Sequence, residues 1–193
     1  MKLLEERIKT DGIVLSEQIL KVDSFINHAV DPILMDQLAD AFYEYFKNKQ
    51  ITKVITIESS GIASAILVAL KLKVPLVIIK KTVAVTTDQE VYSAYVDSFT
   101  KKINYKVTIS KKLLNSNDNC LFIDDFLANG QACLGAVELV KQAKAQMRCF
   151  GILIEKSFQT GRALLDAHNF DVLSLARVWK LDPVSKEIQF VKE

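Results

Sequence analysis

The sequence contains little proline, glycine and cysteine, and these shortages exclude several classes of protein. Of its 193 residues only 3 are proline and 6 are glycine, whereas half are apolar and a quarter are charged; collagen-like and disordered chains have the opposite balance. The three cysteines, Cys120, Cys133 and Cys149, are odd in number and form no close pair. This argues against a disulfide framework and favours a reducing compartment, the cytoplasm. A single globular domain is expected at this length.

A large charge of one sign and a long apolar run are also missing. The formal net charge is only +2, from 25 basic and 23 acidic residues, so the electrostatic signature of a dedicated nucleic-acid binder is absent. The longest uncharged, apolar-leaning stretch, residues 59–70, has 12 residues, whereas a membrane-spanning helix needs about 20. We interpret this stretch as a buried helix. We expect no nucleic-acid partner, no membrane association and, from the charged first residues, no secretory signal.

Strands and helices alternate through the middle of the chain. A β-branched run at 54–57 is followed by a polar loop and an Ala/Leu-rich helix at 62–72, and such changes of pattern mark a strand, a loop and a helix. Alternation of this kind predicts right-handed crossovers and a largely parallel sheet, with ligands beyond the carboxyl ends of the strands. The remaining predicted elements are a helix from Asp31-Pro32 to about 47–49, strands at 76–79, 120–124 and 149–154, and a helix at 131–145.

The region from residue 81 to residue 114 breaks this alternation. It is polar, rich in threonine and contains Tyr92, Tyr95, Phe99 and Tyr105. We interpret about residues 81–105 as a mobile flap, accompanied by edge strands.

Two adjacent aspartates, Asp124 and Asp125, end a strand that is expected to be buried, and the loop behind them ends in Ala128, Asn129 and Gly130 before a helix. The unpaired N–H groups at a helix start bind phosphate well. The two carboxylates would repel a phosphate, but they accept hydrogen bonds from the hydroxyls of a ribose attached to it. The spacing therefore favours a ribose-and-phosphate site, and a solvated Asp-Asp turn is the alternative.

Two commoner phosphate motifs are excluded. Gly130 and Gly135 have the glycine spacing of a Walker loop, but Ala136 occupies the position of the required lysine, and the sequence contains no Gly-x-Gly-x-x-Gly. These gaps disfavour nucleoside triphosphate hydrolysis and a Rossmann dinucleotide site.

The run at 121–132 resembles the signature of type I purine phosphoribosyltransferases. That signature has apolar residues, Asp-Asp, an apolar pair and a loop of small residues, usually with threonine before the glycine. The chain has Asn129 there, which makes it similar to the xanthine branch of the family, and the resemblance extends to 14–28, 56–62 and 155–159. It implies an α/β fold with a mostly parallel central sheet flanked by helices. The core would span about residues 31–160, and a small hood would come from about 1–30 and 161–193.

The same resemblance implies the reaction and the site. The reaction would transfer 5-phosphoribose from 5-phosphoribosyl 1-pyrophosphate (PRPP) to xanthine, giving XMP and pyrophosphate, in a homodimer with Mg²⁺ held mainly through PRPP. The residues that match the family's motifs are Asp124 and Asp125 as catalytic residues, Ala128, Asn129, Gly130, Gln131 and Ala132 for the 5′-phosphate, Leu20, Asn27 and Lys156 for the base, and Ser59, Ser60 and Lys81 for the pyrophosphate.

Lys156 ends an apolar strand and suits a carbonyl group, because its ammonium has three donors and no acceptor. A 6-oxopurine presents such an oxygen, whereas adenine would leave the lysine unpaired at a cost of about 1–3 kcal/mol. Xanthine and guanine differ only at the 2-position, so Lys156 does not separate them. The amide of Asn27 can present either a donor or an acceptor. A solvated lysine at a strand end is the alternative interpretation.

Two other functions stay open at this point. One is a guanine/hypoxanthine phosphoribosyltransferase. The other is a regulatory protein that senses PRPP without catalysis, and near-neutral charge together with the lack of a DNA-reading segment disfavours it.

Overall fold

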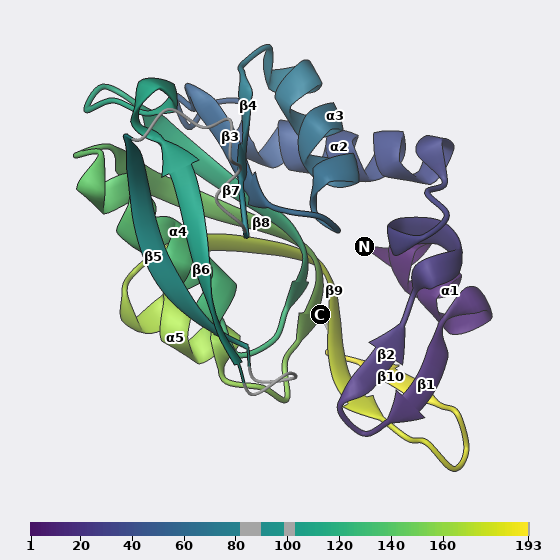
Figure 1. Cartoon of the computed structure of the whole chain (residues 1–193). Helices are drawn as coiled ribbons and strands as arrows, with labels where there is room; N and C mark the ends of the chain where they lie inside the picture. Colours follow the sequence, from purple (N-terminus) through teal and green to yellow (C-terminus); the bar gives the residue numbers. More distant parts are fainter. Residues whose placement is uncertain (82–89, 99–102, 193) are drawn as a thin grey trace.

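A six-stranded sheet forms the centre of the molecule (Figure 1). The computed structural model describes residues 1–81, 90–98 and 103–192. Neighbouring strands of the sheet pair in parallel, except that the last strand is antiparallel; the mostly parallel sheet expected from the sequence is therefore confirmed. In spatial order the strands are β10 (Ile188–Phe190), β9 (Asp171–Leu181), β8 (Gln146–Lys156), β7 (Asn119–Leu127), β3 (Lys53–Ile57) and β4 (Leu76–Ile79).

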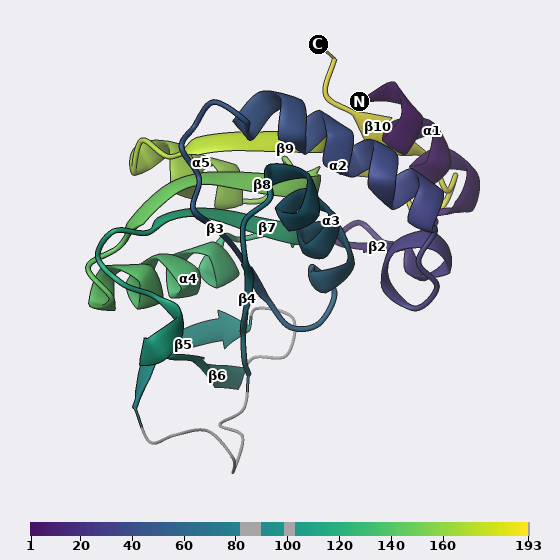
Figure 2. The same ribbon diagram turned by 90° about the horizontal axis from the view of Figure 1, so that it is seen from above.

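Helices cover both faces of this sheet (Figure 2). α2 (Pro32–Phe46) and α3 (Ile62–Leu72) lie on one face, and α4 (Gln131–Gln142) and α5 (Gly161–Ala167) lie on the other. Successive strand side chains point to opposite faces, and accordingly Val54 belongs to one hydrophobic cluster and Ile55 to the other. Burial on both sides explains why the strands of the sheet are continuously apolar.

The helix predicted from Asp31-Pro32 is present, and its start has the expected cap. The carboxylate of Asp31 accepts hydrogen bonds from the N–H groups of Ile33 and Leu34, each at 3.1 Å. These bonds satisfy donors that have no partner inside the helix.

The prediction that residues 59–70 form a buried helix is wrong in part. α3 occupies most of this stretch and packs Ala65 and Val68 into the core, but Ile66 is 54% exposed and Leu70 is 70% exposed. Only one stripe of the helix faces the sheet, so the apolar residues on its outer side stay at the surface.

Three predicted boundaries are also wrong. β7 continues to Leu127 instead of ending at Asp124, because it pairs with β8 as far as Glu155. β8 likewise spans residues 146–156 rather than 149–154. α4 ends at Gln142 and not at residue 145, since Lys144 has a φ of 58° and leaves the helical conformation. Asp125 therefore lies within a strand and not in a loop.

An antiparallel hairpin, β5 (Val91–Ser98) and β6 (Ile103–Ser110), packs on α4. Gly135 of α4 permits this contact, because a Cβ there would lie 2.4 Å from a methyl carbon of Val96. Part of the flap expected at 81–105 falls on residues 82–89 and 99–102, which lie outside the described residues. The described part of this region forms β5 and the beginning of β6.

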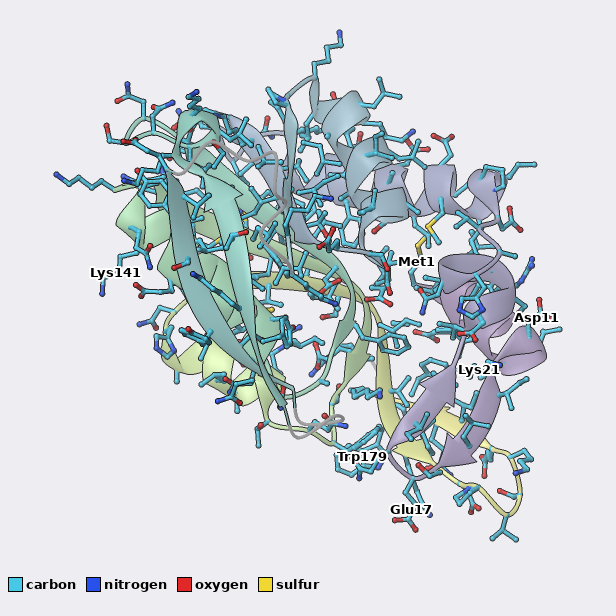
Figure 3. The ribbon with its side chains drawn as sticks, viewed as in Figure 1. Met1, Asp11, Glu17, Lys21, Lys141 and Trp179 are labelled. Atoms are coloured by element: carbon cyan, nitrogen blue, oxygen red, sulfur yellow. The ribbon has the colours of Figure 1, made fainter. Side chains whose placement is uncertain are left out.

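The N-terminal segment forms a separate layer at one end of the sheet. It contains α1 (Lys2–Asp11), the antiparallel pair β1 (Ile13–Ser16) and β2 (Ile19–Lys21), and the π-helix η1 (Asp23–Asn27). Glu17 marks the tip of the hairpin in Figure 3, and α1 lies beside β10 in Figures 1 and 2. In the segment from residue 161 onward, α5 packs against β9, and β9 is itself a strand of the central sheet. The proposed limits of core and hood stay a prediction.

Candidate active site

The order in which the chain adds strands to the sheet reverses between β3 and β7. From β3 the chain proceeds outward to β4 and later returns to β7 on the other side of β3. In open parallel sheets, ligands bind beyond the carboxyl ends of two strands related in this way. The turn after β3 contains Ser59 and Ser60, and the end of β7 carries Asp124 and Asp125. The topology thus brings the predicted ribose and pyrophosphate residues to one place.

The two aspartates are adjacent in β7, and Asp125 is buried while Asp124 is half-buried. The backbone N–H of Asp125 donates to Oδ1 of Asp124 at 3.0 Å. Burial and the negative charge of Asp125 raise the pKa of Asp124 well above its ordinary value, and burial also raises the pKa of Asp125. Two carboxylates in such a position are stabilised by hydroxyl donors or by a cation. Both are supplied by a ribose that carries a magnesium-bound pyrophosphate.

Three groups from other segments surround Asp124. A Cβ on Gly61 would lie 2.8 Å from its Oδ1, so the turn after β3 packs directly against the carboxylate. The positive charge of Lys81 opposes the rise in the pKa of Asp124. The Lys81 ammonium lies 5.5 Å from the ring centroid of Tyr105, and burial together with the charge of Asp124 raises the pKa of Tyr105.

The predicted pyrophosphate residues are anchored by Glu58. Its carboxylate accepts from the backbone N–H of Lys81 at 2.6 Å and from the Lys80 ammonium at 2.8 Å. Ser59 is exposed and Ser60 is half-buried in the turn that follows, and the Glu58–Ser59 peptide bond is cis. Glu58 therefore ties this turn to residues 80–81. It also forms an ion pair with Lys80.

The loop predicted to bind the 5′-phosphate, Ala128 to Ala132, connects β7 to α4. Gly130 directly precedes α4 with a φ of 83°, a conformation that favours glycine. The first N–H groups of a helix have no partner within the helix, and such groups bind phosphate well. Asn129 accepts through its side-chain oxygen from the backbone N–H of Gln131 at 3.4 Å. The other end is fixed by Gly161, which donates to the carbonyl of Ala128 at 2.9 Å.

Two of the three predicted base-binding residues influence Asp125. A hydrogen bond from the Asn27 side chain lowers the pKa of the Asp125 carboxyl group, and the Oδ1 of Asn27 is buried and has no hydrogen-bond partner among the described residues. Burial lowers the pKa of Lys156, while the negative charge of Asp125 opposes that change. The Lys156 ammonium donates to the carbonyl of Gln18 at 2.8 Å and lies 5.1 Å from the ring centroid of Phe126.

Leu20, the third predicted base-binding residue, has a different environment. Its side chain is 5% exposed and belongs to the hydrophobic cluster that the N-terminal segment shares with α2, α3 and one face of the central sheet. It has little surface to offer a ligand, although it lies in the same hairpin as Gln18.

Sequence reasoning missed four contributors to the site: Gln18, Glu58, Tyr105 and Phe126. Phe126 belongs to the apolar pair of the signature run, and Tyr105 was noted only as an aromatic residue in a polar region, so each carried a weak signal. Gln18 acts through its backbone carbonyl, which leaves no mark in a sequence.

Within the described residues, no cluster of three or more His, Cys, Asp or Glu side chains is placed to hold a metal ion. Asp124 and Asp125 do supply the hard oxygen donors that Mg²⁺ prefers, and their raised pKa values show that nearby positive charge would stabilise them. These residues therefore fit a magnesium ion shared with a substrate. Among the helices that the structure describes, none combines the length and apolarity needed to cross a membrane.

A family model described as "Phosphoribosyl transferase domain" matches residues 29–185. The chain belongs to the phosphoribosyltransferase family. Curated relatives are similar over their full length: xanthine phosphoribosyltransferase 1 of Clostridium botulinum is 52% identical over 192 residues, with 100% of both chains covered. Xanthine phosphoribosyltransferase of Acinetobacter baumannii is 51% identical over 193 residues, again with 100% of both chains covered.

Solved structures of other phosphoribosyltransferases have the same fold. Adenine phosphoribosyltransferase of Thermoanaerobacter pseudethanolicus matches with a TM-score of 0.76 at 20% identity, over 90% of this chain and 99% of that chain. The Saccharomyces cerevisiae enzyme, solved with an iminoaltritol bisphosphate and adenine, matches with a TM-score of 0.74 at 26% identity, over 91% and 99%. The type I phosphoribosyltransferase fold expected from the sequence is therefore confirmed.

Proposed function

We propose that this phosphoribosyltransferase transfers 5-phosphoribose from PRPP to a ring nitrogen of xanthine, producing XMP and pyrophosphate. The observation that supports the proposal is that Asn27 and Lys156, from two different segments, each interact electrostatically or by hydrogen bonding with Asp125, one of the two carboxylates that suit a ribose. The full-length similarity to proteins named xanthine phosphoribosyltransferase supports the choice of base.

Base recognition follows from the direction of two hydrogen bonds. The Lys156 ammonium presents only donors, which match the 6-oxygen of an oxopurine. Asn27 commits its NH₂ group to Asp125 and keeps an unpaired acceptor, Oδ1, which matches a ring N–H. Xanthine has both features. Adenine has an amino donor at the 6-position and acceptor nitrogens at ring positions 1 and 3, so it would leave both protein groups unsatisfied.

The ribose and its 5′-phosphate are bound by different chemistry. Asp124 and Asp125 accept from the ribose hydroxyls and stabilise the positive charge that develops on the ring when pyrophosphate leaves. Backbone N–H groups of Ala128 to Ala132 at the start of α4 bind the phosphate. These contacts position the anomeric carbon against the base, and positioning is the main contribution that the chain makes to the rate.

The leaving pyrophosphate would be bound by Ser59, Ser60 and Lys81 on the other side of Asp124. Mg²⁺, held mainly by PRPP oxygens with the two carboxylates nearby, would neutralise the charge of the leaving group. Lys80 is paired with Glu58, whereas the charge of Lys81 acts on Asp124. The Lys81 ammonium is therefore the better candidate to bind the pyrophosphate.

The proposal also includes a homodimer and a location in the cytoplasm. Ile33 on α2 and Ile66 and Leu70 on α3 are exposed apolar side chains on two helices that pack together, and a homodimer contact would cover them. The three cysteines are buried and free, as expected for an enzyme of the reducing cytoplasm.

Purified enzyme incubated with Mg²⁺, PRPP and xanthine tests the reaction. We expect XMP and pyrophosphate in equal amounts, measured by chromatography and by a coupled pyrophosphate assay. No turnover with xanthine, guanine or hypoxanthine would refute phosphoribosyl transfer to an oxopurine, whereas turnover with guanine or hypoxanthine alone would refute only the choice of base.

A further inference from the structure

A fully buried carboxylate, Glu155, immediately precedes Lys156 at the end of β8. Burial alone would raise the pKa of Glu155, but hydrogen bonds from Ser157, Arg162 and Ser174 outweigh it and lower the pKa to about 2. The group is therefore a permanent negative charge at neutral pH. Its Oε1 accepts from Ser157 Oγ at 2.7 Å and Arg177 Nε at 3.0 Å, and its Oε2 accepts from Arg162 Nε and Nη2 at 2.9 and 2.7 Å and from Ser174 Oγ at 2.7 Å.

On one side this network adjoins Lys156, the next residue of β8. Consecutive residues of a strand point to opposite sides, so Lys156 extends toward Gln18 and Phe126 while Glu155 points into the protein. A rotation of the strand end that broke the bonds of Glu155 would also move the Lys156 ammonium.

The other side of the network reaches the loop that suits the 5′-phosphate. Arg162 donates two hydrogen bonds to Glu155 from the first turn of α5. Its neighbour Gly161 donates to the carbonyl of Ala128 at 2.9 Å, and a Cβ on Gly161 would lie 2.4 Å from that oxygen. The start of α5 and the loop are therefore packed too closely to shift independently.

We propose that Glu155 is a positioning residue that fixes the base-binding lysine and the phosphate-binding loop relative to each other. This inference rests on the proposed function, because it assumes that the two substrates occupy these two places. Glu155 is fully buried and touches no substrate itself. A displacement of about 1 Å between reacting groups costs up to about 100-fold in rate, so a shared anchor for both substrates has a direct catalytic use.

Replacing each of the two arginines in turn distinguishes a positioning role of the network from simple neutralisation of the Glu155 charge. Arg162 links Glu155 to the loop through α5. Arg177 pairs with the same carboxylate at 3.0 Å from the neighbouring strand β9, but none of its hydrogen bonds in the described structure leads to the loop. Removing either cation leaves the buried carboxylate with one arginine, whereas only removal of Arg162 releases the loop.

The first test compares Glu155→Gln with a matched control, Asp118→Asn. Asp118 is also a buried carboxylate, with Lys53 at 3.0 Å and Thr52 at 3.1 Å, but it lies before the first residue of β7, at the other end of the sheet. We expect the KM for xanthine and the KM for PRPP to rise about tenfold or more in Glu155→Gln. In Asp118→Asn both KM values should stay within about twofold of wild type, whatever thermal stability is lost. Unchanged KM values in Glu155→Gln, or equal rises in both variants, would overturn the proposal.

The second test keeps the inference open to refutation if Glu155→Gln does not fold. Arg162→Gln should raise the KM for PRPP about tenfold, Arg162→Lys should give an intermediate value because lysine lacks the paired N–H geometry, and Arg177→Gln should change it less than about threefold. Equal effects of Arg162→Gln and Arg177→Gln would contradict positioning. Wild-type enzyme assayed in parallel separates the two claims: no turnover of xanthine by wild type refutes the proposed function, whereas normal turnover with unaffected variants refutes only the role of Glu155.

Discussion

Lys156 combines three properties that distinguish it from the other lysines the structure describes. Burial lowers its pKa, it contacts an aromatic ring, and within the described residues its ammonium donates to a neutral carbonyl rather than to a carboxylate. An ammonium with unused donors in a water-poor position binds a carbonyl oxygen strongly. This environment was invisible in the sequence, where a solvated lysine at a strand end was an equally reasonable interpretation.

We expect Lys156→Ala to lower kcat/KM for xanthine about 10- to 100-fold, since a hydrogen bond from a charged group is worth about 1.5–3 kcal/mol. The dissociation constant for PRPP, measured by calorimetry, should change less than about threefold. Lys180→Ala, at an exposed position on β9, is the matched control and should leave both quantities unchanged. An equal loss of PRPP binding in Lys156→Ala would show that Lys156 does not serve the base.

The pKa of Glu155 makes stability depend on pH. Its folded pKa of about 2 lies below its ordinary value of 4.5, so the folded state favours the ionised form, and this stabilisation is present above about pH 5. It is lost as the pH falls from about 4.5 toward 2, and amounts to roughly 3 kcal/mol. Urea unfolding at a series of pH values should show that Glu155→Gln removes this part of the acid dependence. Parallel curves for wild type and variant would contradict the assigned pKa.

The elements of the central sheet were largely predictable, and the reasons for the errors are physical. α3 and β4 have the predicted limits because composition changes sharply at Gly61 and Pro75. β7 extends beyond its predicted end because its pairing with β8 allows Asp125 to remain in a strand, and such pairing depends on residues far away in sequence. The contact of Glu155 with Arg177, from two strands of the same sheet, has the same origin.

The packing of α5 against the loop yields a prediction at the scale of elements. Gly161→Ala should raise the KM for PRPP about tenfold, because the new Cβ would lie 2.4 Å from the Ala128 carbonyl oxygen and displace the loop. Gly135→Ala is the control: its Cβ would meet Val96 at the same distance, but in the contact between α4 and the β5–β6 hairpin. Thermal unfolding should reveal destabilisation in both variants, and steady-state kinetics a raised KM for PRPP only in Gly161→Ala. A normal KM in Gly161→Ala would mean that α5 does not set the loop.

At the scale of the whole molecule, apolar side chains at the surface of α3 suggest where two copies of the chain would contact each other. Leu70 is 70% exposed beside Ile66 on α3. We expect Leu70→Glu to convert a homodimer into monomers, as measured by light scattering after size exclusion, because a charge in an apolar contact is costly. Val184→Glu changes an equally apolar residue that is 91% exposed elsewhere and should leave the mass unchanged. A dimer that persists in Leu70→Glu would place the contact on another surface.

The choice of base is the central claim about the whole molecule. It depends on residues that lie far apart in the sequence. Lys156 ends β8 and Asn27 comes from the π-helix η1, and only in the folded chain do both interact with Asp125, Lys156 through its charge and Asn27 through a hydrogen bond. The most direct test is therefore a comparison of kcat/KM for xanthine, guanine, hypoxanthine and adenine with saturating PRPP and Mg²⁺. We predict the highest value for xanthine and the lowest, by about 100-fold or more, for adenine, which leaves charged and buried groups unpaired. A higher value for guanine, hypoxanthine or adenine than for xanthine would contradict the account.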